Sequence, residues 1–130
     1  MAVAKLHIRT KRIYEPAEEV DGIRILVDRL WPRGLSRKDA NIDAWLKDIA
    51  PSPVLRKWFH HDPQRWTDFR RRYREELTNN PDAVARINAL AANDPVTLLY
   101  AAQDENHNHA LVLAAYLEHQ GGAKSADADR

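Results

Sequence analysis

Two short runs that are apolar on both faces constrain the fold of this chain more than any other feature. Ile25–Val27 and Val96–Ala102 consist almost wholly of aliphatic, β-branched or aromatic residues, without the regular polar alternation of a half-exposed strand. Such runs are typical of strands in a parallel sheet that is covered on both sides. Helical patterns fill most of the chain between and after them. The sequence therefore predicts an α/β fold: a single three-layer domain with a small, mostly parallel sheet flanked by helices.

Hydrophobic spacing and capping residues indicate the other elements. Lys5–Ile13 alternates like a half-buried strand, and its link to the next strand is so short that the relative direction of the two stays open. Ser52 and Asp62 each precede a proline and are typical of helix starts. The expected helical stripes lie within 42–49, 54–59, 66–77, 84–91 and 109–118. We expect one α/β domain over residues 1–120 and a tail without fixed structure over 121–130.

Charge and cysteine content narrow the function classes. The chain has 130 residues, a formal net charge of +1 and no cysteine, which excludes disulfide scaffolds, thiolate metal sites and cysteine nucleophiles. Residues 1–74 carry 17 Lys and Arg against 10 Asp and Glu, whereas residues 75–130 carry 3 against 9. The basic part is a candidate surface for phosphate or nucleic acid, or else the two parts neutralise each other within one copy or between copies. No apolar run approaches a membrane span, no signal peptide is recognisable, and cytoplasmic is the default expectation.

Two polar clusters follow buried strands and are the candidate site. Ligands of open α/β sheets bind beyond the carboxyl ends of the strands, so both clusters would share one edge if their strands are parallel neighbours. We predict that His109 is a general acid or base and that Asp28 orients it or accepts a proton. The predicted ligand-binding residues, suited to a phosphate-bearing ligand, are Arg29, Trp31, Arg33, Asp104 and Asn108.

Each candidate also has a structural interpretation. An ion pair between Asp28 and an arginine could close the loop, with Trp31 in the core, and Asp104 or Asn106 could cap the last helix. Capping accounts for His107 better than function does. A divalent metal is not favoured, because His107 and His109 stand at a spacing that points them to different sides of a helix. The pair His60 and His61, next to Asp62, resembles a joint between helices more than a ligand set.

A basic helix offers an alternative function. Arg70, Arg71 and Arg74 lie on the helix of the aromatic stripe from Trp66 to Tyr73 and could contact nucleic-acid phosphates. The stripe is too regular for a stacking platform, so its aromatic residues are assigned to the core, while the role of the arginines stays open. This alternative is a non-catalytic, nucleic-acid-binding or regulatory module.

Three stretches carry a family resemblance. The segments 28–34 (DRLWPRG), 55–77 and 96–117 resemble the YeaO-like proteins, which belong to a group known as domain of unknown function 488. The resemblance implies no established activity, but it does favour parallel neighbouring strands. The wider group typically has a Cys-His-Arg motif at the start of the last helix, and Asn108, His109 and Ala110 occupy those places. Only the histidine is kept, which favours His109 over His107 as the site residue.

The sequence therefore favours an enzyme-like domain that acts on a phosphate-bearing small molecule or a nucleic-acid end. The binding module is the alternative, and an interaction between copies through the basic and acidic surfaces is a third hypothesis.

Overall fold

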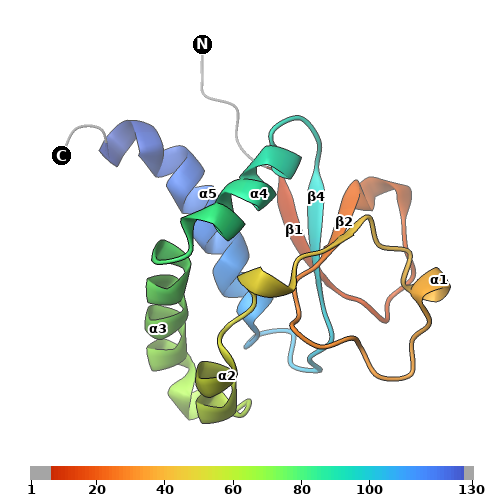
Figure 1. Cartoon of the computed structure of the whole chain (residues 1–130), viewed down its shortest axis with the longest axis horizontal. Helices are drawn as coiled ribbons and strands as arrows, with labels where there is room; N and C mark the ends of the chain where they lie inside the picture. The colour runs from red at the N-terminus through yellow and green to blue at the C-terminus, as the bar shows by residue number, and fades with distance from the viewer. Residues whose placement is uncertain (1–6, 128–130) are drawn as a thin grey trace.

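A four-stranded, all-parallel sheet forms the centre of the computed structural model, which describes residues 7–127 (Figure 1). The order of the strands is β1-β4-β2-β3, so that the last strand along the chain lies between the first two. This confirms the predicted small parallel sheet, and it makes the first two strands parallel to each other although they are not neighbours. The strands are β1 (Ile8–Arg12), β2 (Ile23–Leu26), β3 (Ala44–Trp45) and β4 (Val96–Tyr100).

Two helical segments begin where the sequence places capping residues. Ser52 Oγ accepts a hydrogen bond from Leu55 N (3.1 Å), and the carboxylate of Asp62 accepts one from Gln64 N (3.0 Å). Both caps were predicted and both are confirmed. The described α-helices are α1 (Arg37–Ala40), α2 (Pro53–Phe59), α3 (Trp66–Thr78), α4 (Pro81–Ala91) and α5 (His109–Asp127), with single 3-10 turns at Glu19–Asp21, Lys47–Ile49 and Pro63–Arg65.

The larger core lies between one face of the sheet and α3, α4 and α5 (Figure 1). Residues of β4 alternate between the two faces: Leu98 contributes to this core and Leu99 to the smaller core opposite. On α3, Tyr73 is completely buried, and its hydroxyl donates to Ile49 O (2.7 Å). The predicted aromatic stripe of α3 is therefore part of the core, as its regular spacing indicated.

The opposite face of the sheet is covered mainly by the segment 27–43, which contains only the four-residue helix α1. Trp31 and Trp45 meet edge to face there, with ring centroids 5.2 Å apart, and the guanidinium of Arg37 lies 4.2 Å from the Trp31 ring centroid. The third layer thus consists of a loop and one short helix held by two tryptophans, rather than of long helices.

One predicted helix is wrong. The spacing of Ile42, Trp45 and Ile49 indicated a helix, but Ala44 and Trp45 form strand β3 beside β2, and Leu46 N donates to Leu26 O (2.9 Å). Pairing with the otherwise open edge of β2 overrides the local spacing here. The last helix was expected to end at Glu118, whereas α5 continues to Asp127, into the segment expected to lack fixed structure. Residues 128–130 of that segment lie outside the described residues.

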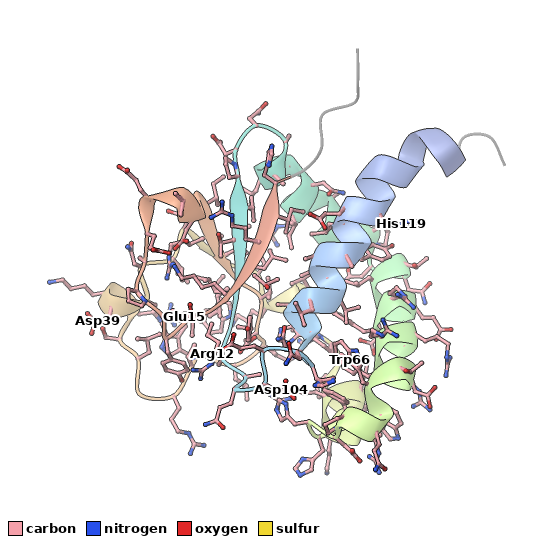
Figure 2. All side chains as sticks on the ribbon, turned by 180° about the vertical axis from the view of Figure 1, so that it is seen from behind. Arg12, Glu15, Asp39, Trp66, Asp104 and His119 are labelled. Carbon is pink, nitrogen blue, oxygen red and sulfur yellow. The ribbon has the colours of Figure 1, made fainter. Side chains whose placement is uncertain are left out.

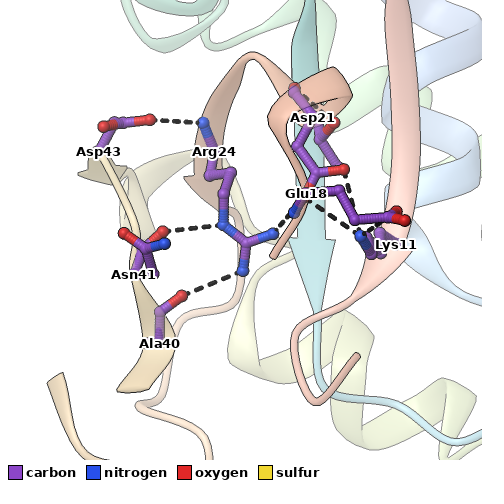
Figure 3. Close-up of polar contacts among 8 residues, drawn as sticks. Lys11, Glu18, Asp21, Arg24, Ala40, Asn41 and Asp43 are labelled. Carbon is purple, nitrogen blue, oxygen red and sulfur yellow. Dashed lines mark hydrogen bonds and ion pairs between the residues drawn. The ribbon is translucent and has the colours of Figure 1, made fainter. Parts of the chain in front are cut away.

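A buried ion cluster ties the connection between β1 and β2 to the rest of the fold (Figure 3). Asp21, only 3% exposed, accepts hydrogen bonds from Arg24 Nη1 (2.6 Å) and Lys11 Nζ (3.1 Å). Arg24, 5% exposed, also donates to the carbonyl oxygens of Ala40 and Asn41. The cluster therefore joins β1, β2 and the end of α1.

Candidate functional site

One pocket of about 360 Å³ lies at the carboxyl edge of the sheet, and we call it the sheet-edge pocket. Residues that follow β2, residues that follow β4, and the start of α5 line it together, because β2 and β4 are parallel neighbours. This is the place where open α/β sheets bind ligands. Of the predicted site residues, the lining includes Asp28, Arg29, Trp31, Arg33, Asn108 and His109.

Asp28 and His109 face each other at this pocket. His109 Nε2 lies 3.0 Å from Asp28 Oδ1 and 3.1 Å from Val27 O, and the two side chains are 16% and 17% exposed. A carbonyl oxygen only accepts hydrogen bonds, so Nε2 carries a hydrogen in this arrangement. The other carboxylate oxygen of Asp28 accepts from Ala101 N (3.1 Å), at the end of β4. The pair is thus fixed by the ends of both strands.

Asn108 is the N-cap of α5. Its Oδ1 accepts from Leu111 N (3.1 Å), and its Nδ2 donates to Asp104 O (3.0 Å). The expectation that Asp104 or Asn106 caps this helix is therefore wrong. The carboxylate of Asp104 instead accepts hydrogen bonds from Asn106 N and His107 N in the loop before the helix. Both ends of the buried Asn108 amide are engaged in holding the start of α5, so its contribution to a ligand is geometric: it fixes the backbone that carries His109.

Three arginines line the sheet-edge pocket. Arg29 donates to Ala50 O (3.3 Å) and Pro51 O (3.4 Å), which holds its guanidinium against the segment before α2. Arg33 and Arg56 are exposed, and of the ion pairs formed by the described residues none involves Arg29, Arg33 or Arg56. Asp28 is the one carboxylate on the described lining. The pocket therefore has an excess of positive charge that suits an anion.

Trp31 and Asp104 have mainly structural contacts. Trp31 lines the pocket, but its Nε1 donates to Leu35 O (2.6 Å) and its ring packs on Trp45. Asp104 lies in the loop after β4 and is not on the pocket lining (Figure 2). Hydrogen bonds, first from Asn106 N and then with the side chain of His107, lower the pKa of Asp104. His107 lies 2.9 Å from Asp104 and edge-on to Trp66, so this group braces the loop.

The arginines of α3 lie outside the sheet-edge pocket and most of them have local partners. Arg71 pairs with Asp68 (3.8 Å) and Glu75 (3.6 Å), and the guanidinium of Arg70 lies 5.8 Å from the Trp66 ring centroid. Arg74 is exposed. Within residues 7–127, no group of three or more acidic or histidine side chains is placed to hold a metal ion. No helix in that part of the chain has the length and apolarity that a membrane span requires.

The sequence reasoning missed the far wall of the pocket. Arg56 and Phe59 on α2, His61 after it, Phe69 on α3 and Tyr14 after β1 complete the lining. His60 and His61 both adopt positive φ (45° and 55°), which turns the chain sharply between α2 and α3. The sequence correctly assigned the adjacent histidines to the connection between two helices. The spacing of residues alone does not show that this connection reaches the pocket at the carboxyl edge of the sheet.

Comparison with known proteins gives a family but no activity. The model of a family described as "Inactive DUF488-N3 subclade" matches residues 7–130. The uncharacterised protein YeaO of Escherichia coli is 47% identical over 86% of this chain and 97% of its own length. The uncharacterised proteins Mb3100c of Mycobacterium bovis and Rv3073c of Mycobacterium tuberculosis are each 41% identical over 88% of this chain and 97% of their own. No solved structure shows a significant match.

Proposed function

Because this chain belongs to the DUF488-N3i family, described as the inactive DUF488-N3 subclade, we propose that it binds a phosphate-bearing ligand in the sheet-edge pocket without transforming it. The observation that carries the proposal is the set of three arginines, Arg29, Arg33 and Arg56, that line one pocket without an ion-pair partner among the described residues. Arginine offers forked donors that match phosphate oxygens, and a pocket wall keeps water from screening them fully.

Two observations favour binding over catalysis. The family description calls the subclade inactive. In addition, the resemblance implies that Asn108 stands where the wider group has a cysteine, and both the oxygen and the nitrogen of its amide are used in hydrogen bonds at the start of α5. A side chain that is already committed to the helix start offers no nucleophile. The site is therefore best described as an anion-binding pocket at the strand ends.

Replacing both exposed pocket arginines, Arg33→Gln with Arg56→Gln, should weaken pyrophosphate binding at least about tenfold, since each guanidinium contributes a charge-assisted hydrogen bond. Isothermal titration calorimetry with pyrophosphate measures this. The matched control is Arg71→Gln with Arg74→Gln, which removes the same charge from exposed positions on α3 outside the pocket. Equal losses in the two double variants would contradict a pocket site and favour the basic helix of the nucleic-acid alternative.

A phosphoryl-transfer or hydrolytic enzyme is the second candidate, and the pair of Asp28 and His109 favours it. His109 lies on the pocket lining with Nε2 directed to Val27 O and 3.0 Å from Asp28 Oδ1, so a proton-transferring role for its ring beside an orienting carboxylate fits this arrangement. This assignment gives His109 the catalytic role and Asp28 the orienting role.

Phosphate release from p-nitrophenyl phosphate distinguishes the two candidates. We expect no turnover above background for the unmodified chain. Phosphate release by the unmodified chain, lost in His109→Gln without a change in thermal unfolding, would favour the enzyme over the binding module. Arg71→Gln is the control that should leave any such activity intact, because Arg71 pairs with acidic residues on its own helix.

A further inference from the structure

The sheet-edge pocket combines its cationic groups with an extensive apolar lining. Phe59 from α2 and Phe69 from α3 form one wall, and Ala101 and Ala102, which follow β4, lie at the end of the sheet. A bare anion would use the arginines and leave this apolar surface in contact with water, at a cost that grows with its area. The lining therefore indicates a ligand that also carries an apolar part.

The apolar wall is aromatic and fixed in place. The rings of Phe59 and Phe69 are stacked, with centroids 4.3 Å apart and planes 21° apart, and both residues are at least 95% buried. The ring of His61, tilted by 54°, lies with its centroid 6.1 Å from that of Phe59. Because these rings pack against one another, the wall exists before a ligand arrives, and an aromatic wall of this kind favours a flat aromatic partner.

Exposed apolar side chains gather at the same pocket. Within the described residues, four large hydrophobic side chains are exposed, and two of them, Tyr14 (42% exposed) and Leu30 (59% exposed), line this pocket. Tyr14 is held there by a hydrogen bond from its hydroxyl to Arg33 O (2.8 Å). An exposed apolar group beside a concave site is typical of a surface that a ligand covers.

Most polar side-chain atoms of the pocket are engaged by the protein, but two buried ones, Asp28 Oδ1 and Arg29 Nε, have no hydrogen-bond partner among the described residues. The carboxylate of Asp28 faces Ala101 N and His109, and the amide of Asn108 is fully used by the start of α5. A hydroxyl group of a ligand could donate to Asp28 Oδ1 or accept from Arg29 Nε, and either bond would satisfy a buried polar atom. The lining therefore suits a ligand that joins its apolar part to a few hydrogen-bonding groups.

We infer that the ligand is a nucleoside monophosphate, with its phosphate held by Arg29, Arg33 and Arg56 and its base against the wall of Phe59, Phe69 and Leu30. This inference rests on the proposed function, because it assigns the ligand class of the same pocket. The pocket volume, about 360 Å³, lies within the range of small-molecule sites. A phosphate group and a flat heteroaromatic ring match the charged and the apolar side chains of the lining.

Four probes test this inference by calorimetry: AMP, ribose 5-phosphate, adenosine and pyrophosphate. We expect AMP to bind at least about tenfold more tightly than ribose 5-phosphate, because the base buries aromatic surface. Adenosine should bind more weakly than AMP. Equal affinity for AMP and ribose 5-phosphate, with pyrophosphate binding retained, would overturn the nucleotide assignment and leave the proposed function standing. If none of the four binds, the proposed function fails and the inference falls with it.

A pair of variants locates the base. Leu30→Ser should weaken AMP binding about threefold and leave the affinity for pyrophosphate unchanged, since Leu30 offers apolar contact only. Val54→Ser is the matched control, because Val54 is also exposed (80%) but lies on α2 away from the pocket lining. Loss of pyrophosphate binding in Leu30→Ser, or an equal loss of AMP binding in both variants, would contradict the placement of the base.

Discussion

Replacing Gly22 by alanine should prevent stable folding, with a loss in the free energy of unfolding of at least about 4 kcal/mol. Gly22 ends the 3-10 turn before β2 at φ +64° and ψ −134°, a combination that side chains rarely allow. A Cβ atom there would overlap the carbonyl group of Pro95, which accepts the hydrogen bond from Ile23 N that begins the pairing of β2 with β4. Urea denaturation followed by circular dichroism measures the loss.

Gly34→Ala is the control for this prediction. Gly34 also has positive φ (75°), but no atom lies within 4 Å of the position its Cβ would take. Only the conformational cost remains, about 1 kcal/mol. A Gly22→Ala variant no less stable than Gly34→Ala would show that β2 and β4 can separate at this point without loss, and would contradict the argument.

Asp21→Asn should lower the free energy of unfolding by about 3–5 kcal/mol, because it leaves the buried guanidinium of Arg24 without its countercharge. The substitution keeps the size of the side chain, so the effect reports charge rather than a cavity. Asp21 also accepts from Glu18 N (3.0 Å), a bond that an amide oxygen can retain. Thermal and urea unfolding at neutral pH measure the change.

The pH dependence of stability provides a second readout of the same cluster. Burial alone raises the pKa of Asp21, but hydrogen bonds from Glu18 N, Lys11 and Arg24 outweigh it, so that its pKa lies below the ordinary value of 3.8. The stabilisation is therefore complete above that ordinary value and is lost as the pH falls through the lower pKa of the folded state. The unmodified chain should lose stability more steeply than Asp21→Asn between about pH 5 and about pH 2.

Glu18→Gln is the matched control for the buried charge. Glu18 pairs with Lys11 (2.9 Å), but its side chain is 63% exposed, and exposed pairs contribute less than about 1 kcal/mol. The prediction fails if Asp21→Asn is as mild as Glu18→Gln.

The elements that the sequence predicted well are those whose local pattern agrees with their tertiary position. The apolar runs of β2 and β4 and the caps at Ser52 and Asp62 are examples, because burial on both faces and a proline after the cap leave few alternatives. Strand β3 is the opposite case. Its two residues have a helix-like spacing of apolar neighbours, and only the open edge of β2 makes them a strand.

The part of the candidate site that depends on the order of the strands could be predicted from the sequence. Asp28 and His109 could be placed at one edge because each follows or starts an element that the pattern identifies. Arg56 and His61 could not, because they reach the pocket through the packing of α2 against α3 and through two consecutive left-handed residues. Such a turn has no reliable signal in histidine or in any other residue that carries a Cβ.

The position of β4 has a consequence for how the chain reaches its native state. Ile8 pairs with Val96 and Ile23 pairs with the same residue, so the first two strands have no common partner until the fourth is synthesised. Most of the sheet therefore forms across contacts of high sequence separation, and folding should be slow for a domain of this length. During synthesis, β1 and β2 therefore emerge before β4, the strand with which both of them pair.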